Sequence, residues 1–123
     1  MSKIYRVIAC LGLIFSVFAV SSCSDSKGVL DEHECLNLNV EASCYTWGRK
    51  LESTNMAKAL RIHEKACDMT HTEGCVRIGE IYFERKEYLK ANKWFKRACQ
   101  ANNTRGCVQQ AETLLKLKGQ QQK

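Results

Sequence analysis

The segments "KACDMTHTEGC" (residues 65–75) and "RACQANNTRGC" (residues 97–107) share one pattern. Each has a basic residue, an alanine and a cysteine, then seven residues, and then a second cysteine that follows a glycine. The same pattern therefore occurs twice in succession along the chain. A fixed period of roughly 20–50 residues is the signature of a repeat architecture, so the pattern predicts a chain of similar structural units.

The other cysteines extend this spacing over most of the chain. The first cysteines of the units stand at positions 35, 67 and 99, and the second ones at 44, 75 and 107. The first series is evenly spaced, and the second departs from the same period by a single position, between 44 and 75. Three units are therefore expected, of which the first is degenerate in sequence, as terminal repeats tend to be.

Apolar residues between the cysteines recur at helical spacing. In the last unit Ala91, Trp94, Phe95 and Ala98 stand at i, i+3, i+4 and i+7, which is one face of an α-helix. The segment 59–66 repeats this face one period earlier and has His63 where the later unit has Phe95. Each unit thus reads as a first helix (the A helix), a short turn and a second helix (the B helix). The expected helices cover residues 29–38, 42–52, 54–68, 73–85, 87–101 and 105–118.

A small residue follows the second cysteine of each unit by four positions. These residues are Gly48, Gly79 and Ala111. Glycine inside a helix costs up to about 1 kcal/mol of helix propensity, so its recurrence requires a packing reason. We expect close approach between helices at all three positions.

The N-terminus has the features of a bacterial lipoprotein signal. Lys3 and Arg6 precede an uncharged apolar run over residues 7–20, which is short for a membrane span and typical of a signal peptide. The run ends in "VSSC" (residues 20–23), which resembles the lipobox of lipoproteins. This resemblance implies cleavage before Cys23, attachment of lipid to that cysteine, and a mature chain of residues 23–123. By the family's sorting rules, Ser24 favours the outer membrane.

The charge of the mature chain is mild. Removal of Lys3 and Arg6 leaves 17 basic residues against 13 acidic ones, a net charge of +4. Such a balance gives no indication of nucleic-acid binding. The expected domains are the signal peptide at 1–22, a lipidated tether at 23–28, a repeat domain at 29–118 and a polar tail at 119–123.

The repeat domain resembles the Sel1-like repeats, which are relatives of the tetratricopeptide repeat. The segment "CVRIGEIYFERKEYLKANKWFKRAC" (residues 75–99) carries the family's B-helix glycine and tyrosine and its A helix ending in Ala-Cys. The seven-residue gap between cysteines is similar to that of the Helicobacter cysteine-rich proteins. The resemblance implies an all-α fold, a short α/α solenoid of about three helix pairs that binds a protein partner. The chain departs from that subgroup through a shorter repeat and through the longer gap between its first two cysteines.

Six cysteines in an oxidising compartment allow 15 pairings, of which the repeat favours the one within units. Each bond would join the end of an A helix to the start of a B helix, where a turn brings two Cα atoms within disulfide reach. Each would stabilise the thin core of such a chain by roughly 2–3 kcal/mol. The expected disulfides are Cys35–Cys44, Cys67–Cys75 and Cys99–Cys107.

A metal or redox site is the first alternative. His63, Cys67, His71 and Cys75 stand four positions apart and would form a zinc-like face on one continuous helix. The next unit keeps both cysteines and loses both histidines, so we expect no metal and no other cofactor. We place His63 at the edge of the core and His71 in a turn.

An enzyme is the second alternative. "SDSK" (residues 24–27) matches the Ser-x-x-Lys motif of penicillin-recognising enzymes but lacks the partner motifs that this chemistry needs. Weak β-lactamase activity is ascribed to the cysteine-rich subgroup, yet the resemblance transfers no catalytic residue. An activity on peptidoglycan or β-lactams stays the minor alternative, and no catalytic residue is predicted.

Basic residues at spacings of three and four run beside the apolar faces of two A helices. In related solenoids the A helices line the groove that binds partners, so these residues predict a positive groove for an acidic protein segment or an anionic envelope polymer. We expect a lipid-anchored protein of the bacterial envelope, on the outer membrane and facing the periplasm. The basic residues are Lys58, Arg61 and Lys65 on one helix and Lys86, Lys90, Lys93 and Arg97 on the next.

Overall fold

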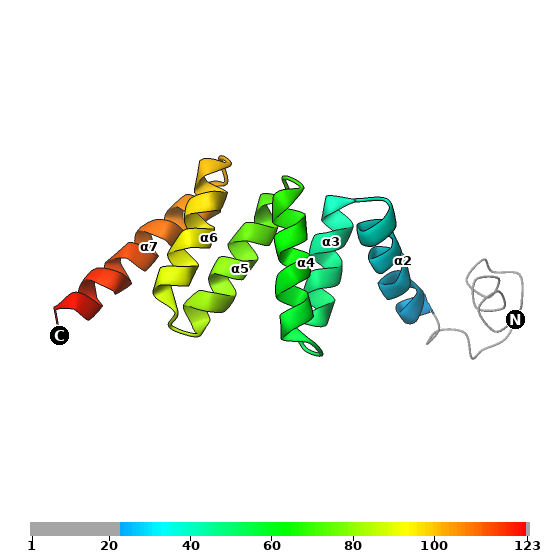
Figure 1. The fold of residues 1–123 in the computed structure, drawn as a ribbon, viewed down its shortest axis with the longest axis horizontal. Helices are drawn as coiled ribbons and strands as arrows, with labels where there is room; N and C mark the ends of the chain where they lie inside the picture. Colours follow the sequence, from blue (N-terminus) through cyan, green and yellow to red (C-terminus); the bar gives the residue numbers. More distant parts are fainter. Residues whose placement is uncertain (1–22, 123) are drawn as a thin grey trace, which may run out of the picture.

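The computed structural model describes residues 23–122, and within that range it contains six α-helices and no strand (Figure 1). The prediction of an all-α fold is confirmed for this part of the chain. The predicted signal peptide at 1–22 and the side chain of Cys23 lie outside what the structure describes. The helices are α2 (Cys23–Asn37), α3 (Glu41–Leu51), α4 (Met56–Asp68), α5 (Thr72–Glu84), α6 (Tyr88–Gln100) and α7 (Thr104–Gln121).

The helix boundaries agree with the prediction in the middle of the chain and differ at its two ends. α2 begins at Cys23, so the segment 23–28 is helical where we expected a tether. α7 continues to Gln121, so most of the expected polar tail is helical as well. No proline interrupts either end. The single Gly119 costs only about 1 kcal/mol, and lysine and glutamine are good helix formers.

Within each unit, one residue in the left-handed region turns the chain back. Thr70 and Asn102, with φ of 73° and 62°, occupy equivalent positions between the A and the B helix. After each of them a backbone N–H bonds to a carbonyl earlier in the A helix: His71 to Ala66 and Asn103 to Ala98, both at 3.0 Å. This bond closes the A helix with a Schellman-type end and sends the B helix back antiparallel to it.

The three disulfides that the repeat predicts are present. They are Cys35–Cys44, Cys67–Cys75 and Cys99–Cys107, with Cα–Cα distances of 4.5, 5.0 and 4.4 Å. Each bond joins the last turn of an A helix (α2, α4 or α6) to the first turn of the B helix that follows it. Four of the six cysteines also belong to the buried core clusters. Two of the disulfides therefore contribute to the packing of the core, in addition to closing short loops.

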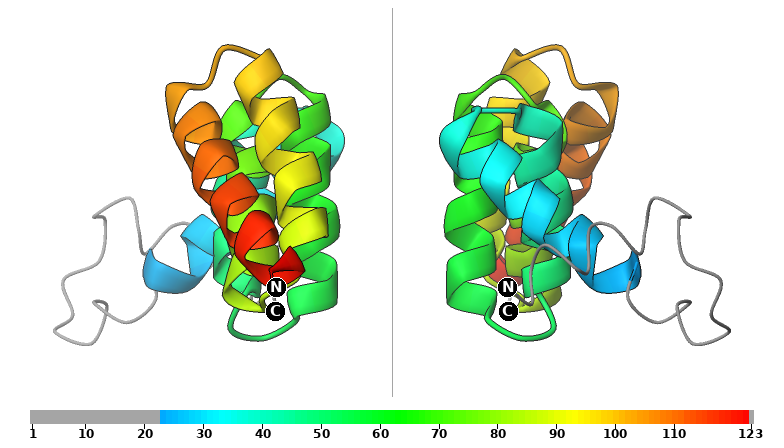
Figure 2. Two further views of the ribbon diagram at one scale, coloured as in Figure 1. Left: turned by 90° about the vertical axis from the view of Figure 1, so that its left-hand side faces the viewer. Right: turned by 90° about the vertical axis from the view of Figure 1, so that its right-hand side faces the viewer.

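The helices pack in chain order, and the core is correspondingly thin. Each helix lies mainly against the helices before and after it, and the six form an elongated row (Figure 1). Viewed along that row, α4 and α6 lie on one side and α7 on the other (Figure 2). Buried residues form two clusters, one around Trp47 and Ile62 and one around Val76 and Phe95. Neither cluster spans the whole row.

Glycine allows two of the helix junctions to close. A Cβ atom added to Gly79 would lie 2.5 Å from the Phe95 ring, and one added to Gly48 would lie 2.7 Å from the His63 ring. The prediction of close approach is therefore confirmed at both glycines. It is wrong at Ala111, which is exposed because no described helix follows α7.

His63 and Phe95 fill equivalent places in the two junctions. Both side chains are fully buried, at 0% exposure. His63 therefore lies inside the core rather than at its edge as predicted, because the ring sits directly on Gly48 and α3 covers it. Because the ring is buried, its two nitrogens can form hydrogen bonds only with groups of the protein.

Candidate functional site

The basic residues predicted as a binding face lie on α4 and α6, with one exception. Lys58, Arg61 and Lys65 are on α4, and their equivalents in the next unit are on α6. Lys86 lies in the turn before α6, with φ of 61°, so its predicted place in the helical stripe is wrong. The turn forms there because Glu87 N–H bonds to the Tyr82 carbonyl, which closes α5 before the chain enters α6.

Three of these basic side chains are paired with acids and lie on aromatic rings. Lys58 Nζ is 3.7 Å from Glu32 and 4.6 Å from the centre of the Trp47 ring. Lys90 pairs with Glu87 and lies over Tyr82. The hydrogen bond to Glu87 raises the pKa of Lys90 above its ordinary value.

Arg97 is paired in the same way and also joins two A helices. Its guanidinium donates to Asp68 at 2.5 Å and lies 5.7 Å from the Trp94 ring. Asp68 ends α4 and Arg97 is in the last turn of α6, so the contact holds the two helices side by side at that end. Half of the predicted helical charge is therefore already compensated.

Part of the positive charge on α4 and α6 stays uncompensated, and one pair of these residues, Arg61 and Lys93, stands at equivalent positions. In the described part of the chain, no ion pair involves Arg61, Lys65, Lys93 or Lys96. Arg61 and Lys93 are exposed and stand one repeat apart, on the same face of successive A helices. Lys96 was not among the predicted residues, although its place between Lys93 and Arg97 is the signal that indicates it. Three predicted residues, Arg61, Lys65 and Lys93, thus stay unpaired among the described residues, and Lys96 joins them as a fourth.

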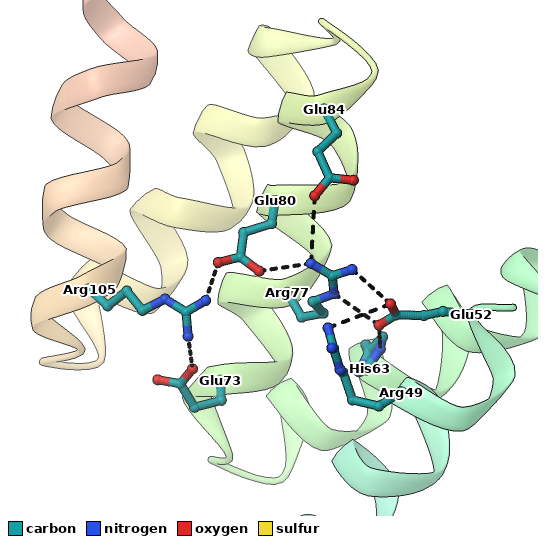
Figure 3. A network of polar contacts seen from close by, with 8 residues as sticks. All are labelled: Arg49, Glu52, His63, Glu73, Arg77, Glu80, Glu84 and Arg105. Atoms are coloured by element: carbon teal, nitrogen blue, oxygen red, sulfur yellow. Dashed lines mark hydrogen bonds and ion pairs between the residues drawn. The ribbon is translucent and has the colours of Figure 1, made fainter.

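A second polar feature, a chain of ion pairs, runs along the B helices and was not predicted (Figure 3). Glu52, directly after α3, accepts from Arg77 through both carboxylate oxygens, at 2.9 and 2.7 Å. The same carboxylate is 2.9 Å from His63 Nε2 and 3.6 Å from Arg49. Glu52 therefore joins α3, α4 and α5 at one point.

The chain of ion pairs continues to α7. Arg77 donates to Glu80 at 3.0 Å, and the other oxygen of Glu80 accepts from Arg105. Arg105 also donates to Glu73 at 2.9 Å. Asn103 donates to the other oxygen of Glu73, at 2.8 Å. Acids of α5 are thereby bound to the start of α7, so the network connects all three units.

The contacts around Glu52 shift its own pKa and that of His63. Burial favours a higher pKa for Glu52, but hydrogen bonds from Arg77 and His63 outweigh it and lower the pKa below the usual 4.5. Burial lowers the pKa of His63 below 6.5, against the opposing effect of Glu52. His63 is therefore neutral at pH 7 and donates from Nε2 to Glu52, while its Nδ1 is buried without a partner.

This network is built to hold the units together. Its only imidazole is fully buried and its arginines are compensated, and the residues drawn in Figure 3 include no hydroxyl or thiol that could act as a nucleophile. A solvent-open hollow of about 320 Å³ lies between the start of α6 and the end of α7, and no residue of the network lines it. The arrangement favours a structural role for the network.

The structure also locates the zinc-like His/Cys set and the Ser-x-x-Lys segment. Cys67 and Cys75, half of the zinc-like set, are bonded to each other, and the part of the chain that the structure describes contains no cluster of three metal-ligating side chains. The Ser-x-x-Lys segment 24–27 has a helical backbone in α2, and its side chains lie outside the description. None of the helices among residues 23–122 has the length and apolar character that membrane crossing requires.

Comparison of the chain with protein-family models, with curated proteins and with solved structures finds no match.

Proposed function

We propose that this protein is a binding scaffold, whose A helices dock an acidic segment of a protein in the bacterial cell envelope. In this proposal the three helix pairs form a short Sel1-like solenoid, and a lipid on Cys23 anchors it to the outer membrane on the periplasmic side. The chain acts by positioning a partner and carries out no reaction of its own.

One observation carries the proposal: exposed, uncompensated positive charge recurs at equivalent positions of successive A helices. Arg61 on α4 and Lys93 on α6 repeat at the period of the fold, and Lys65 and Lys96 lie beside them. A surface that repeats with the scaffold suits an extended ligand that meets one unit after another. Its charge favours acidic side chains, because opposite charges steer association and fix the register of binding.

The contacts made by neighbouring basic side chains also support a binding role. The paired side chains Lys58, Lys90 and Arg97 lie across aromatic rings, and Arg97 bonds α6 to α4 through Asp68. The disulfides fix each A helix to its B helix. A partner that binds such a surface loses less free energy to ordering than it would on a flexible one.

The proposed location follows from the disulfides and the N-terminal sequence. Three disulfides persist in an oxidising compartment such as the periplasm and are rare in the cytosol. The lipobox-like segment "VSSC" supplies the anchor. Together they support export of the chain and attachment to a membrane by lipid.

The proposal is tested by capture of envelope proteins on the immobilised full chain. The test variant carries Arg61→Glu and Lys93→Glu, which reverse the charge of the proposed binding face. The control variant carries Arg85→Glu and Lys86→Glu, which reverse two exposed charges at the α5–α6 turn instead. We expect the unmodified chain and the control to capture the same partner, and the test variant to lose it by at least about tenfold.

Salt provides a second readout. Exposed charges are screened beyond about 8 Å at physiological ionic strength, so capture should weaken steadily as sodium chloride is raised. Equal capture by the unmodified chain and the test variant, or capture that ignores salt, excludes the charged face as the binding site.

A further inference from the structure

The outer face of α7 repeats a face that is covered in the preceding unit. Val76, Gly79 and Phe83 of α5 pack against α6. Their equivalents one repeat later are Val108, Ala111 and Leu115, which we name the α7 outer face. Val108 is 64% exposed, Leu115 is 69% exposed, and none of the described residues covers them. We propose that two copies of this chain pair through the α7 outer face, with their α7 helices antiparallel.

The α7 outer face does not fit another helix of the A type. At both internal junctions an aromatic ring of the A helix lies directly on a glycine of the B helix. The equivalent residue in α7 is Ala111. At Gly79 a Cβ atom would come within 2.5 Å of the Phe95 ring, so an alanine at this position prevents the same fit.

Head-to-tail stacking of copies is disfavoured for a chemical reason. Asp31 of α2 is the equivalent of His63 and Phe95, and it would have to enter the apolar face of the neighbouring copy. Its carboxylate is paired with Lys50, and the nearby Glu34 accepts from Ser43. Burial of these groups against Val108 and Leu115 would remove water without a new polar partner, which is costly.

A second α7 helix fits the face better. Ala111, Leu115 and Gly119 follow one another at intervals of four, so they lie along one side of the helix. No heavy atom lies within 4 Å of the place where a Cβ atom of Gly119 would be. In an antiparallel pair that crosses at Leu115, each Ala111 lies opposite Gly119 of the partner subunit. Two small residues then allow the helices to approach closely.

Charge at the border of the face agrees with this arrangement. Glu112 and Lys116 are exposed on the same side of the α7 outer face, and neither has an ion-pair partner within residues 29–122. The two-fold axis of an antiparallel pair brings Glu112 of each chain near Lys116 of the partner subunit. The face is thus self-complementary in shape and in charge, as a two-fold interface must be.

The first test measures the mass of the full chain in non-ionic detergent by light scattering and sedimentation over a range of concentrations. We expect a dimer, and we expect Leu115→Glu to raise its dissociation constant at least tenfold. The matched control is Val29→Glu, since Val29 is an apolar residue on α2 with a similar exposure of 67%. Helical circular dichroism of both variants checks that they fold. A monomer at all concentrations, or a dimer that Leu115→Glu leaves intact, overturns the proposal.

The second test determines the orientation of the two helices. An antiparallel crossing at Leu115 places the two copies of residue 115 together, so Leu115→Cys should give a disulfide-linked dimer on a non-reducing gel. The two copies of residue 108 are then about 20 Å apart at about 1.5 Å of rise per residue, so Val108→Cys should not crosslink. Crosslinking at residue 108, or none at residue 115, contradicts the antiparallel arrangement.

Discussion

The substitution Gly79→Ala tests the packing of the repeats most sharply. Inside a helix this change normally stabilises, because alanine has about 1 kcal/mol more helix propensity than glycine. Here the new methyl group would lie 2.5 Å from a Phe95 ring that is fully buried and also packs against Phe83. The Phe95 ring has no solvent-exposed side toward which it could shift, because its exposure is 0%.

The net effect is therefore a loss of stability. Overpacking of a core costs up to about 3 kcal/mol, and the gain in propensity offsets about 1 kcal/mol of this. A net loss of about 2 kcal/mol lowers the melting temperature of a domain of this size by about 8–16 °C. The assay is thermal unfolding followed by circular dichroism, with the disulfides kept intact.

The same change elsewhere in the chain serves as the control. Gly119 of α7 has no neighbour within 4 Å of an added Cβ atom, so Gly119→Ala should leave stability unchanged or raise it slightly. Combining Gly79→Ala with Phe95→Leu should cost less than the sum of the two single changes, because the smaller side chain makes room. A Gly79→Ala protein as stable as the parent would refute the proposed close junction.

Three further predictions concern the bonds within and between units. Replacement of Cys67 and Cys75 by serine should lower the free energy of unfolding by about 2–3 kcal/mol, as measured by urea denaturation, and a loss smaller than about 1 kcal/mol would show that the bond does not stabilise the fold. Glu52→Gln removes the charged partner that joins Arg77 to the end of α3, while Arg77 keeps its bond to Glu80, and should cost about 2 kcal/mol in the same assay; no loss would contradict a structural role for the network. Stability should also fall as the pH drops from 7 to 4: the pKa values of His63 and Glu52 lie below their ordinary values of 6.5 and 4.5, so the unfolded chain binds more protons over that range. His63→Phe should remove the part of this loss that begins near pH 6.5, and an unchanged pH profile would exclude His63 as its source.

Much of the fold could be predicted because the chain repeats itself. Equivalent residues occupy equivalent places, so the cysteine spacing predicted both the turns and the disulfide pairing. The recurrence of Gly48 and Gly79 predicted two close contacts for the same reason. The prediction was wrong at Ala111, since α7 is the last described helix and no further helix packs against this position.

The candidate binding face was predicted only in part. Spacing along a helix shows which basic residues share a face, but it does not show which acids arrive from other elements. Asp68 reaches Arg97 and Glu32 reaches Lys58 only in the folded chain. Lys86 was misplaced, since the turn residue in the left-handed region precedes the helix that the spacing suggested.

The ion pairs along the B helices could not be found by comparing repeats. Arg77 follows its cysteine by two positions, whereas Arg105 precedes its cysteine by two. Both arginines bind acidic side chains of other residues, but they occupy different positions in the repeat. An alignment of the units therefore does not place one arginine on the other. Only the approach of α5 and α7 brings Arg105 to Glu80 and Glu73.

Digestion of the unreduced protein, followed by mass spectrometry of the linked peptides, examines the central claim most directly. If each helical hairpin is closed by its own bond, the linked peptides contain residues 35 with 44, 67 with 75, and 99 with 107. Any peptide that links cysteines of two different units, or free thiols at these six positions, would contradict the account.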